Sequence, residues 1–194
     1  MRNQLHKLLA FMVVTSGIAI ATLVPAVHAQ SSLPAPVALA WEGFAEVLVQ
    51  VGDVYISGQP TAEGFARLQA LGVNTVVNLR TAREMNSRAI VPFDEAQVLT
   101  ELGMNYVHIP SGGPDTPYAP EMVERFAAAL AKADGKVLLH CTVAWRASHL
   151  WTAYLTRYRG VALPIAVEHA RQINLGKLPL EGFLGEEIAI EIAQ

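Results

Sequence analysis

The single cysteine of the chain, Cys141, stands directly after a histidine, His140, and five positions before an arginine, Arg146. The apolar residues 137–139 predict a buried strand, and apolar side chains at three- and four-residue spacing after Arg146 predict a helix. Residues 141–146 would then form a strand-to-helix loop, whose backbone N–H groups converge on one point and bind anions. Such surroundings favour the thiolate. The pattern predicts a cysteine nucleophile inside an oxyanion cradle.

A lone cysteine also has a simpler interpretation, because free cysteines are among the most buried residues and often act only as small apolar side chains. One cysteine cannot close a disulfide within the chain, so the fold must be held by its apolar core. The neighbouring His140 and Arg146 favour the functional interpretation of Cys141, since reactive thiols occur in electropositive surroundings.

The segments around this loop alternate between strand and helix patterns. Short β-branched or apolar runs predict strands at residues 54–56, 74–79, 105–109 and 137–139. Helical spacing predicts helices at residues 61–71, 94–102, 120–134, 147–159, 164–175 and 182–193. Residues 41–51 are interpreted as an N-terminal helix or lead-in, and residues 80–92 as a long loop. The alternation predicts an α/β fold with a mostly parallel central sheet of four to five strands flanked by helices.

The N-terminus carries the pattern of a cleaved secretory signal peptide, predicted at residues 1–29. Arg2 and Lys7 give a basic start, an apolar stretch follows at residues 8–24, and the Val-His-Ala sequence at residues 27–29 resembles a cleavage site. We therefore expect a periplasmic or secreted protein with no membrane span after cleavage. A membrane anchor is the alternative, but it would need about 20 continuous apolar residues.

Cleavage would leave a lead-in at residues 30–49 and one α/β domain at residues 50–194, a length suited to one compact domain. Because two basic and no acidic residues precede position 30, the net charge would change from −3 to −5. An acidic chain argues against nucleic acid as a partner. No cofactor is predicted, and no metal, because ligand spacing to one another or to carboxylates is missing for His108, His149 and His169.

Several short stretches resemble a known family. They are Ile-Ser-Gly-Gln-Pro-Thr at residues 56–61, Gly-Val at residues 72–73 and Val-Val-Asn-Leu-Arg at residues 76–80, together with the His140-Cys141 pair and Arg146. They resemble the bacterial protein-tyrosine-phosphatase-like family, which includes the phosphatase-like domain of the beta-lactamase-hydrolase-like proteins. The similarity extends over about residues 50–175. It implies a cysteine-phosphatase-like fold of the dual-specificity type and a phosphatase activity.

Two-step displacement is the mechanism that the resemblance implies. Cys141 would attack phosphorus, and Arg146 would hold two equatorial oxygens with its planar fork. Asp115, in the Gly- and Pro-rich loop at residues 110–119, resembles the acid that protonates the leaving group and later activates a water. As a plain turn former, Asp115 would have no such role. His140 resembles the family histidine that orders the nucleophile's loop.

Further residues are assigned to binding the phosphorylated substrate, a small molecule or a phosphoprotein. Arg80 ends a predicted parallel strand, where α/β sheets gather ligands, although a surface ion pair is an equal alternative. Phosphatases place a hydroxyl directly after the arginine, where this chain has Ala147, and Ser148 follows one step later. The complete substrate-binding set comprises Thr142, Val143, Ala144, Trp145, Ala147, Ser148 and Arg80.

The loop differs from that of familiar tyrosine phosphatases in two ways. Four residues separate Cys141 from Arg146 in place of five, a spacing that resembles rhodanese-type sulfurtransferases, whose cysteine carries one sulfane sulfur. The loop also contains no glycine, so a residue that needs a positive φ would be strained. Two alternatives to the phosphatase therefore remain: a sulfurtransferase or persulfide carrier that uses the same thiolate, and a catalytically silent module that binds oxyanions.

Overall fold

The structure is a computed structural model that describes residues 33–176 and 180–188. The predicted signal peptide at residues 1–29 lies outside the described residues, and so do residues 189–193 of the helix predicted at 182–193. Within the described ranges, no helix is long and apolar enough to cross a membrane.

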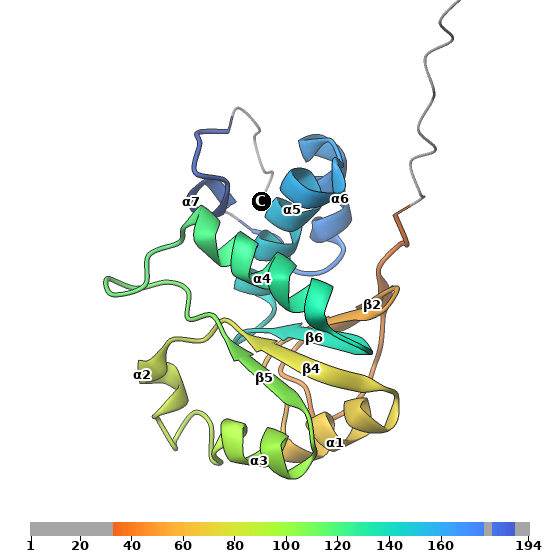
Figure 1. Cartoon of the computed structure of the whole chain (residues 1–194), viewed down its shortest axis with the longest axis vertical. Coiled ribbons are helices and arrows are strands. Elements are labelled where there is room, and N and C mark those ends of the chain that lie inside the picture. Colours follow the sequence, from red (N-terminus) through yellow and green to blue (C-terminus); the bar gives the residue numbers. More distant parts are fainter. Residues whose placement is uncertain (1–32, 177–179, 189–194) are drawn as a thin grey trace, which may run out of the picture. The chain divides into compact units, whose positions relative to one another are not determined.

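A six-stranded sheet forms the centre of the fold (Figure 1). Its strands are β1 Val37–Ala38, β2 Leu48–Val51, β3 Val54–Ser57, β4 Val73–Asn78, β5 Asn105–His108 and β6 Lys136–His140. The strand order is β1-β2-β3-β6-β4-β5, in which β3, β6, β4 and β5 are parallel and β1 and β2 are antiparallel additions. The predicted α/β class with a mostly parallel sheet is confirmed, although the sheet has six strands in place of four to five.

The N-terminal edge of the sheet corrects the interpretation of residues 41–51 as a helix or lead-in. Strand β2 is largely buried and pairs antiparallel with β3 through a two-residue turn, Gly52-Asp53. Gly52 has a φ of 57°, a left-handed conformation that glycine adopts without a Cβ clash. A Gly-Asp pair between two apolar runs is a hairpin signal, so the local sequence explains this strand.

One face of the sheet is covered by helices α1 Ala62–Ala70 and α3 Glu95–Glu101 (Figure 1). Both begin next to the first residue of a predicted helix, which acts as the cap: the side chain of Thr61 accepts the N–H of Gly64, and that of Asp94 accepts the N–H of Gln97. Phe65 of α1 is fully buried, which stabilises the fold by about 1.5–3 kcal/mol. Between β4 and α3, the predicted loop contains the short helix α2 Ala82–Met85.

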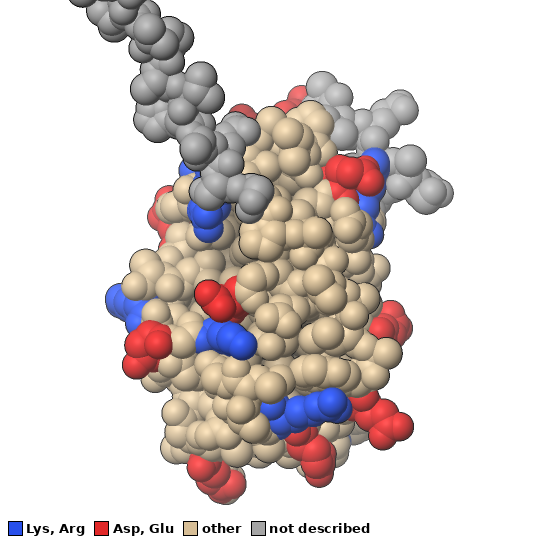
Figure 2. Space-filling view, turned by 90° about the vertical axis from the view of Figure 1, so that its right-hand side faces the viewer, with Lys and Arg blue, Asp and Glu red and all other residues tan. Residues whose placement is uncertain are grey.

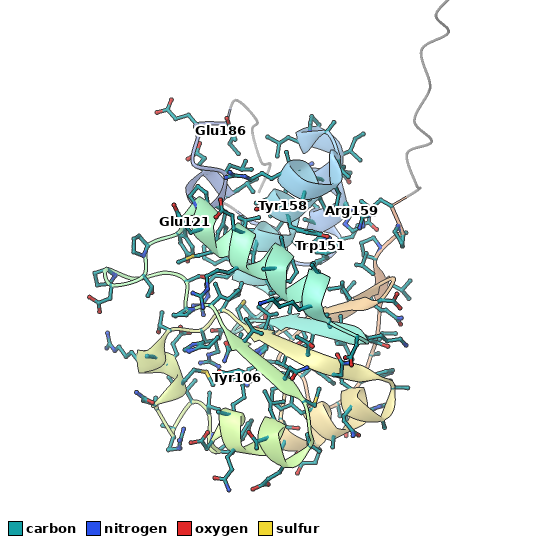
Figure 3. All side chains as sticks on the ribbon, in the orientation of Figure 1. Tyr106, Glu121, Trp151, Tyr158, Arg159 and Glu186 are labelled. Carbon is teal, nitrogen blue, oxygen red and sulfur yellow. The ribbon has the colours of Figure 1, made fainter. Side chains whose placement is uncertain are left out.

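The opposite face carries α4 Pro120–Lys132, α5 Trp145–Arg159, α6 Leu163–Arg171 and α7 Leu180–Leu184 (Figure 1). Helix α5 is central, because it packs on β3 and β6 and also contacts α4, α6 and α7. Trp151 of α5 lies in the layer beside α4, where its ring meets the edge of Phe126 at a centroid distance of 6.4 Å (Figure 3). The start of α5 is therefore fixed relative to the end of β6.

The four parallel strands end at the same edge of the sheet, as parallel topology requires. The segments that follow Ser57, Asn78, His108 and His140 consequently meet there. The candidate site therefore lies at the carboxyl edge of the sheet.

On the face shown in Figure 2, acidic and basic side chains of the described residues are interspersed, without a block of basic ones.

Candidate active site

The segment that joins β6 to α5 and includes the first two residues of the helix, residues 141–146, is here named the nucleophile loop. It is pinned to the end of β3 by three backbone contacts. The N–H of Cys141 donates to the carbonyl of Ser57 at 3.3 Å, the N–H of Gln59 donates to the carbonyl of Thr142 at 2.9 Å, and Gly58 and Val143 form an isolated β-bridge. The loop is thus held as an extension of the sheet, with Cys141 almost completely buried at its start.

The nucleophile loop turns into α5 at Ala144, which has a φ of 65° and is the N-cap residue of the helix. A left-handed conformation costs a non-glycine residue about 1–2 kcal/mol, so the loop carries the strain that its lack of glycine predicts. The side chain of Ala144 gives the helix no capping hydrogen bond. The N–H groups of Trp145, Arg146 and Ala147, in the first turn, have no partners within the helix and suit an anion.

Arg146 is anchored from three sides by its two terminal nitrogens. Its Nη1 donates to the carbonyls of Leu79 and Ser111 at 3.2 and 2.8 Å and to Oε2 of Glu84 at 2.9 Å. Its Nη2 donates to Oε1 of Glu84 at 2.7 Å and to Oγ1 of Thr142 at 2.8 Å. Its Nε–H has no acceptor among the described residues. An oxyanion can therefore bind at the edge formed by Nε and Nη2, where it would replace the Thr142 hydroxyl as an acceptor of Nη2.

Glu84, on α2, is a site residue that the sequence analysis does not identify. It forms a two-point ion pair with Arg146, accepts the Thr142 hydroxyl at 2.9 Å and lies 3.6 Å from Nε of Arg80. Partial burial raises its pKa, but the hydrogen bonds and charge of Arg146, with the backbone N–H of Thr81, outweigh burial and lower the pKa from 4.5 to about 2. Glu84 is thus ionised and cannot serve as the acid.

A local signal for Glu84 exists in the sequence. Thr81 and Glu84 form a capping box, in which the Thr81 side chain accepts the Glu84 N–H and the Glu84 carboxylate accepts the Thr81 N–H. The pattern Thr-x-x-Glu shortly after the apolar run of β4 predicts a helix start at the carboxyl edge of the sheet. It does not reveal that the same carboxylate also reaches Arg146.

A pocket of about 880 Å³ opens over the nucleophile loop. Its walls come from the nucleophile loop, from the α2 segment at residues 81–90 and from the loop at residues 110–118. Six of the predicted site residues line it: Cys141, Thr142, Val143, Trp145, Arg146 and Asp115. The sequence-predicted nucleophile, arginine and acid therefore share one cavity.

Asp115 reaches this pocket on an exposed turn. The turn is closed by the N–H of Gly112, which donates to the carbonyl of Thr116 at 2.7 Å, and by the Thr116 hydroxyl, which donates to the carbonyl of Gly112 at 2.9 Å. Gly112 has a φ of 97°, and a Cβ there would come within 2.7 Å of the Tyr118 hydroxyl. A glycine is therefore required where the turn approaches the pocket wall.

The other residues predicted to bind substrate, Ala144, Ala147, Ser148 and Arg80, are not among those that line the pocket. Ala144 and Ala147 are completely buried below the loop, so they can contribute only backbone groups. The hydroxyl of Ser148 faces the carbonyls of Trp145 and Asn174 at 2.8 and 3.0 Å. Its place in the second half of the first turn of α5 directs it away from the cavity.

His140 and Arg80 belong to a buried polar network behind the nucleophile loop. Nε2 of His140 lies 3.2 Å from Oε1 of Glu95, whose other oxygen accepts Nε2 of Gln59 at 2.7 Å; Arg80 donates to Oε1 of Gln59 at 2.9 Å. Glu95 also accepts the amide of Asn78. Burial raises the pKa of Glu95, but the charge and hydrogen bond of His140 outweigh it and the pKa is lowered.

This network has a supporting function. Asn78 also donates to the hydroxyl of Tyr106, which lies on the α3 side of the sheet (Figure 3). Burial is the main reason that the pKa of Arg80 is lowered, and the Arg80 side chain is only 2% exposed. His140 and Arg80 therefore position the loop from behind and do not meet the pocket. Within the described ranges, no group of three or more His, Cys, Asp or Glu could hold a metal ion.

A cysteine and an arginine that share a pocket with a helix N-terminus, at the carboxyl edge of a mostly parallel sheet, are an arrangement typical of the cysteine phosphatases. Comparison with protein families supports this class. Residues 47–156 match the family described as "Beta-lactamase hydrolase-like protein, phosphatase-like domain". The chain belongs to this family, which confirms the family resemblance seen in the sequence.

Several solved structures are also similar to this chain. A DUF442 protein from Shewanella putrefaciens CN-32 is 30% identical, with 74% of this chain and 91% of that chain covered and a TM-score of 0.56; a second structure from that organism is 32% identical, with 64% and 76% covered and a TM-score of 0.51. The kinase associated phosphatase shares only the fold, at 14% identity, 66% and 76% coverage and a TM-score of 0.52. Among curated proteins, none matches this chain.

Proposed function

We propose that this protein hydrolyses a phosphate monoester through a phosphocysteine formed on Cys141. The observation that carries the proposal is the convergence of Cys141, the Nε–Nη2 edge of Arg146 and the N-terminus of α5 in one pocket. A thiolate supplies the nucleophile, and the guanidinium and N–H groups match the charge of a phosphoryl group. Family membership supports the same chemistry.

The proposed reaction has two steps. In the first, the Cys141 thiolate attacks phosphorus, the bond from phosphorus to the ester oxygen breaks, and Asp115 gives its proton to the departing oxygen. In the second, Asp115 takes a proton from a water, the water oxygen bonds to phosphorus, and the bond to sulfur breaks, which restores the thiolate. Arg146 would hold the equatorial oxygens throughout, oriented by Glu84. The position of Asp115 on the pocket wall supports its role.

A sulfurtransferase is the second candidate, and the four-residue spacing between Cys141 and Arg146 favours it. In that reaction, the thiolate would attack the outer sulfur of thiosulfate, the sulfur–sulfur bond would break, and sulfite would leave with the electron pair. The resulting persulfide would pass its sulfur to an acceptor thiolate. Sulfite needs no proton to leave, so this reaction would not require Asp115.

One set of rates distinguishes these candidates. Wild type, Cys141→Ser, Arg146→Ala and Asp115→Asn are assayed on an alkyl phosphate and on thiosulfate with a thiol acceptor. We expect phosphate release that is lost with Cys141→Ser or Arg146→Ala and lowered about 100-fold by Asp115→Asn. The matched control is Asp53→Asn, an exposed aspartate at the turn between β2 and β3, which should keep the wild-type rate.

Two results would contradict the proposal. Faster turnover of thiosulfate than of the phosphate ester, insensitive to Asp115→Asn, would identify the sulfurtransferase. Binding of phosphate without turnover of either substrate would identify the silent module.

We further propose that the protein is exported to the periplasm or the medium after cleavage between Ala29 and Gln30. The basic start and apolar stretch of the N-terminal sequence support this proposal. N-terminal sequencing of the protein from its native cell tests it. A mature chain that begins near Gln30 is expected, and full-length protein that retains Met1 or Arg2 in the cytoplasm would refute it.

A further inference from the structure

The nucleophile loop lacks the glycine that its conformation favours, so other contacts must hold Ala144 in its left-handed state. The end of β3 holds one side of the loop. The other side is held by residues 174–176, which follow α6 and are here named the C-terminal brace. The amide of Asn174 donates to the carbonyl of Val143 at 2.6 Å. This bond lies one residue before the strained position.

Two further contacts join the C-terminal brace to the first turns of α5. The hydroxyl of Ser148 lies 3.0 Å from the carbonyl of Asn174, and Nε2 of His149 lies 2.9 Å from the carbonyl of Gly176. Both side chains also face the carbonyl of Trp145, at 2.8 and 2.7 Å. Ser148 and His149 are completely buried. The brace and the start of α5 therefore form one hydrogen-bonded unit.

The C-terminal brace lies outside residues 47–156, the part of the chain that matches the family. Val143 and Asn174 are 31 residues apart in the sequence, and α6 packs on α5 between them (Figure 1). The packing of α6 therefore places Asn174 against the nucleophile loop. The contact therefore joins the nucleophile loop to a segment beyond the range that matches the family.

We propose that Asn174 is a positioning residue for the nucleophile loop. Its amide fixes the Val143 carbonyl, keeps Ala144 in the left-handed conformation, and thereby directs the N–H groups of the first turn of α5 into the pocket. The expected effect of Asn174 on oxyanion binding rests on the function proposed above, whereas its expected effect on the order of the nucleophile loop does not. Two separate measurements can therefore test the two parts.

The experiment compares wild type with Asn174→Ala and Asn174→Asp in the full chain. The aspartate has the shape of asparagine, but its carboxylate cannot donate to the Val143 carbonyl, so it tests the hydrogen bond if the alanine variant is poorly folded. Gln172→Ala is the matched control, because Gln172 is exposed two residues earlier. Circular dichroism and urea unfolding establish that each variant is folded under the assay conditions.

Hydrogen exchange of the peptide that spans residues 141–147 reports loop order, and protection of Cys141 from iodoacetamide by vanadate reports oxyanion binding. We expect about tenfold faster amide exchange and about tenfold weaker vanadate protection in both Asn174 variants, the scale of one lost hydrogen bond. Gln172→Ala should match wild type in both measurements.

Each other outcome has a definite meaning. Unchanged exchange in both variants would overturn the proposal, since the loop would then not depend on Asn174. Faster exchange with unchanged vanadate protection would also overturn it, because Asn174 would then have only a structural role. If vanadate fails to protect even wild-type Cys141, the proposed function fails, and hydrogen exchange alone decides whether Asn174 orders the loop.

Discussion

Replacing Glu84 with glutamine removes one charge from the centre of the site and changes little else. Glutamine also serves in capping boxes, so the contact with Thr81 at the start of α2 can persist. What is lost is the negative charge that pairs with Arg146 at two points, 2.7 and 2.9 Å, and with Arg80 at 3.6 Å. Glu84→Gln therefore isolates the contribution of the Glu84 charge to stability.

The pKa of Glu84 gives the size of the expected effect. A decrease from 4.5 to about 2 corresponds to roughly 3 kcal/mol, at about 1.36 kcal/mol per pKa unit. One quarter of the Glu84 side chain is exposed, so solvent screens the pair, and we expect about 1–2 kcal/mol. Because the folded-state pKa is lowered, this stabilisation is complete above about pH 4.5 and disappears as the pH falls toward 2.

Urea unfolding of wild type and Glu84→Gln between pH 7 and pH 2 measures the effect. The difference in free energy of unfolding should be about 1–2 kcal/mol at pH 7 and should shrink as the pH falls toward 2, where the Glu84 carboxylate becomes protonated. Glu124→Gln, on the exposed face of α4, is the control and should lie within about 0.5 kcal/mol of wild type. A difference that is absent at pH 7, or that does not depend on pH, would refute this reasoning.

Two further substitutions and one chemical modification should have measurable effects. Ala144→Gly should raise the free energy of unfolding by about 1 kcal/mol, because it removes the strain of a φ of 65°; destabilisation in thermal unfolding would contradict this. Arg146→Lys should abolish vanadate binding nearly as completely as Arg146→Ala, since one ammonium cannot reproduce five hydrogen bonds; calorimetry checks this result. Cys141 should react with iodoacetamide at pH 6 faster than a free cysteine, and phosphate should slow the reaction; modification only after unfolding would show an inert thiol.

Local sequence patterns were sufficient for most of the framework. The apolar runs of β3, β4 and β6 and the caps Thr61 and Asp94 determine elements through contacts a few residues apart, which is the range that periodicity reports. Strand β2 could also be predicted from the sequence, because the Gly52-Asp53 turn is a hairpin signal. The mixed composition of residues 41–51 concealed this largely buried strand.

The arrangement around the nucleophile could be predicted only in part. Cys141 and Arg146 lie in one loop, so their spacing shows the chemistry directly. The partners of Arg146 and Val143 come from elements that the fold brings together: Glu84 is 62 residues from Arg146, and Asn174 is 31 residues from Val143. No local pattern encodes such contacts. For the same reason, Arg80 and Ser148 were assigned to the pocket, although folding directs both side chains away from it.

The most direct test of the proposed mechanism is the mass of the peptide that contains Cys141 after rapid acid quenching of the protein during turnover of an aryl phosphate. The mechanism predicts that this peptide gains the mass of one phosphoryl group, that the gain is absent in Cys141→Ser, and that Asp115→Asn accumulates it because release by water is slowed. An unmodified Cys141 during phosphate-ester turnover, or a gain of one sulfur atom from thiosulfate with none from the phosphate ester, would contradict the phosphocysteine mechanism.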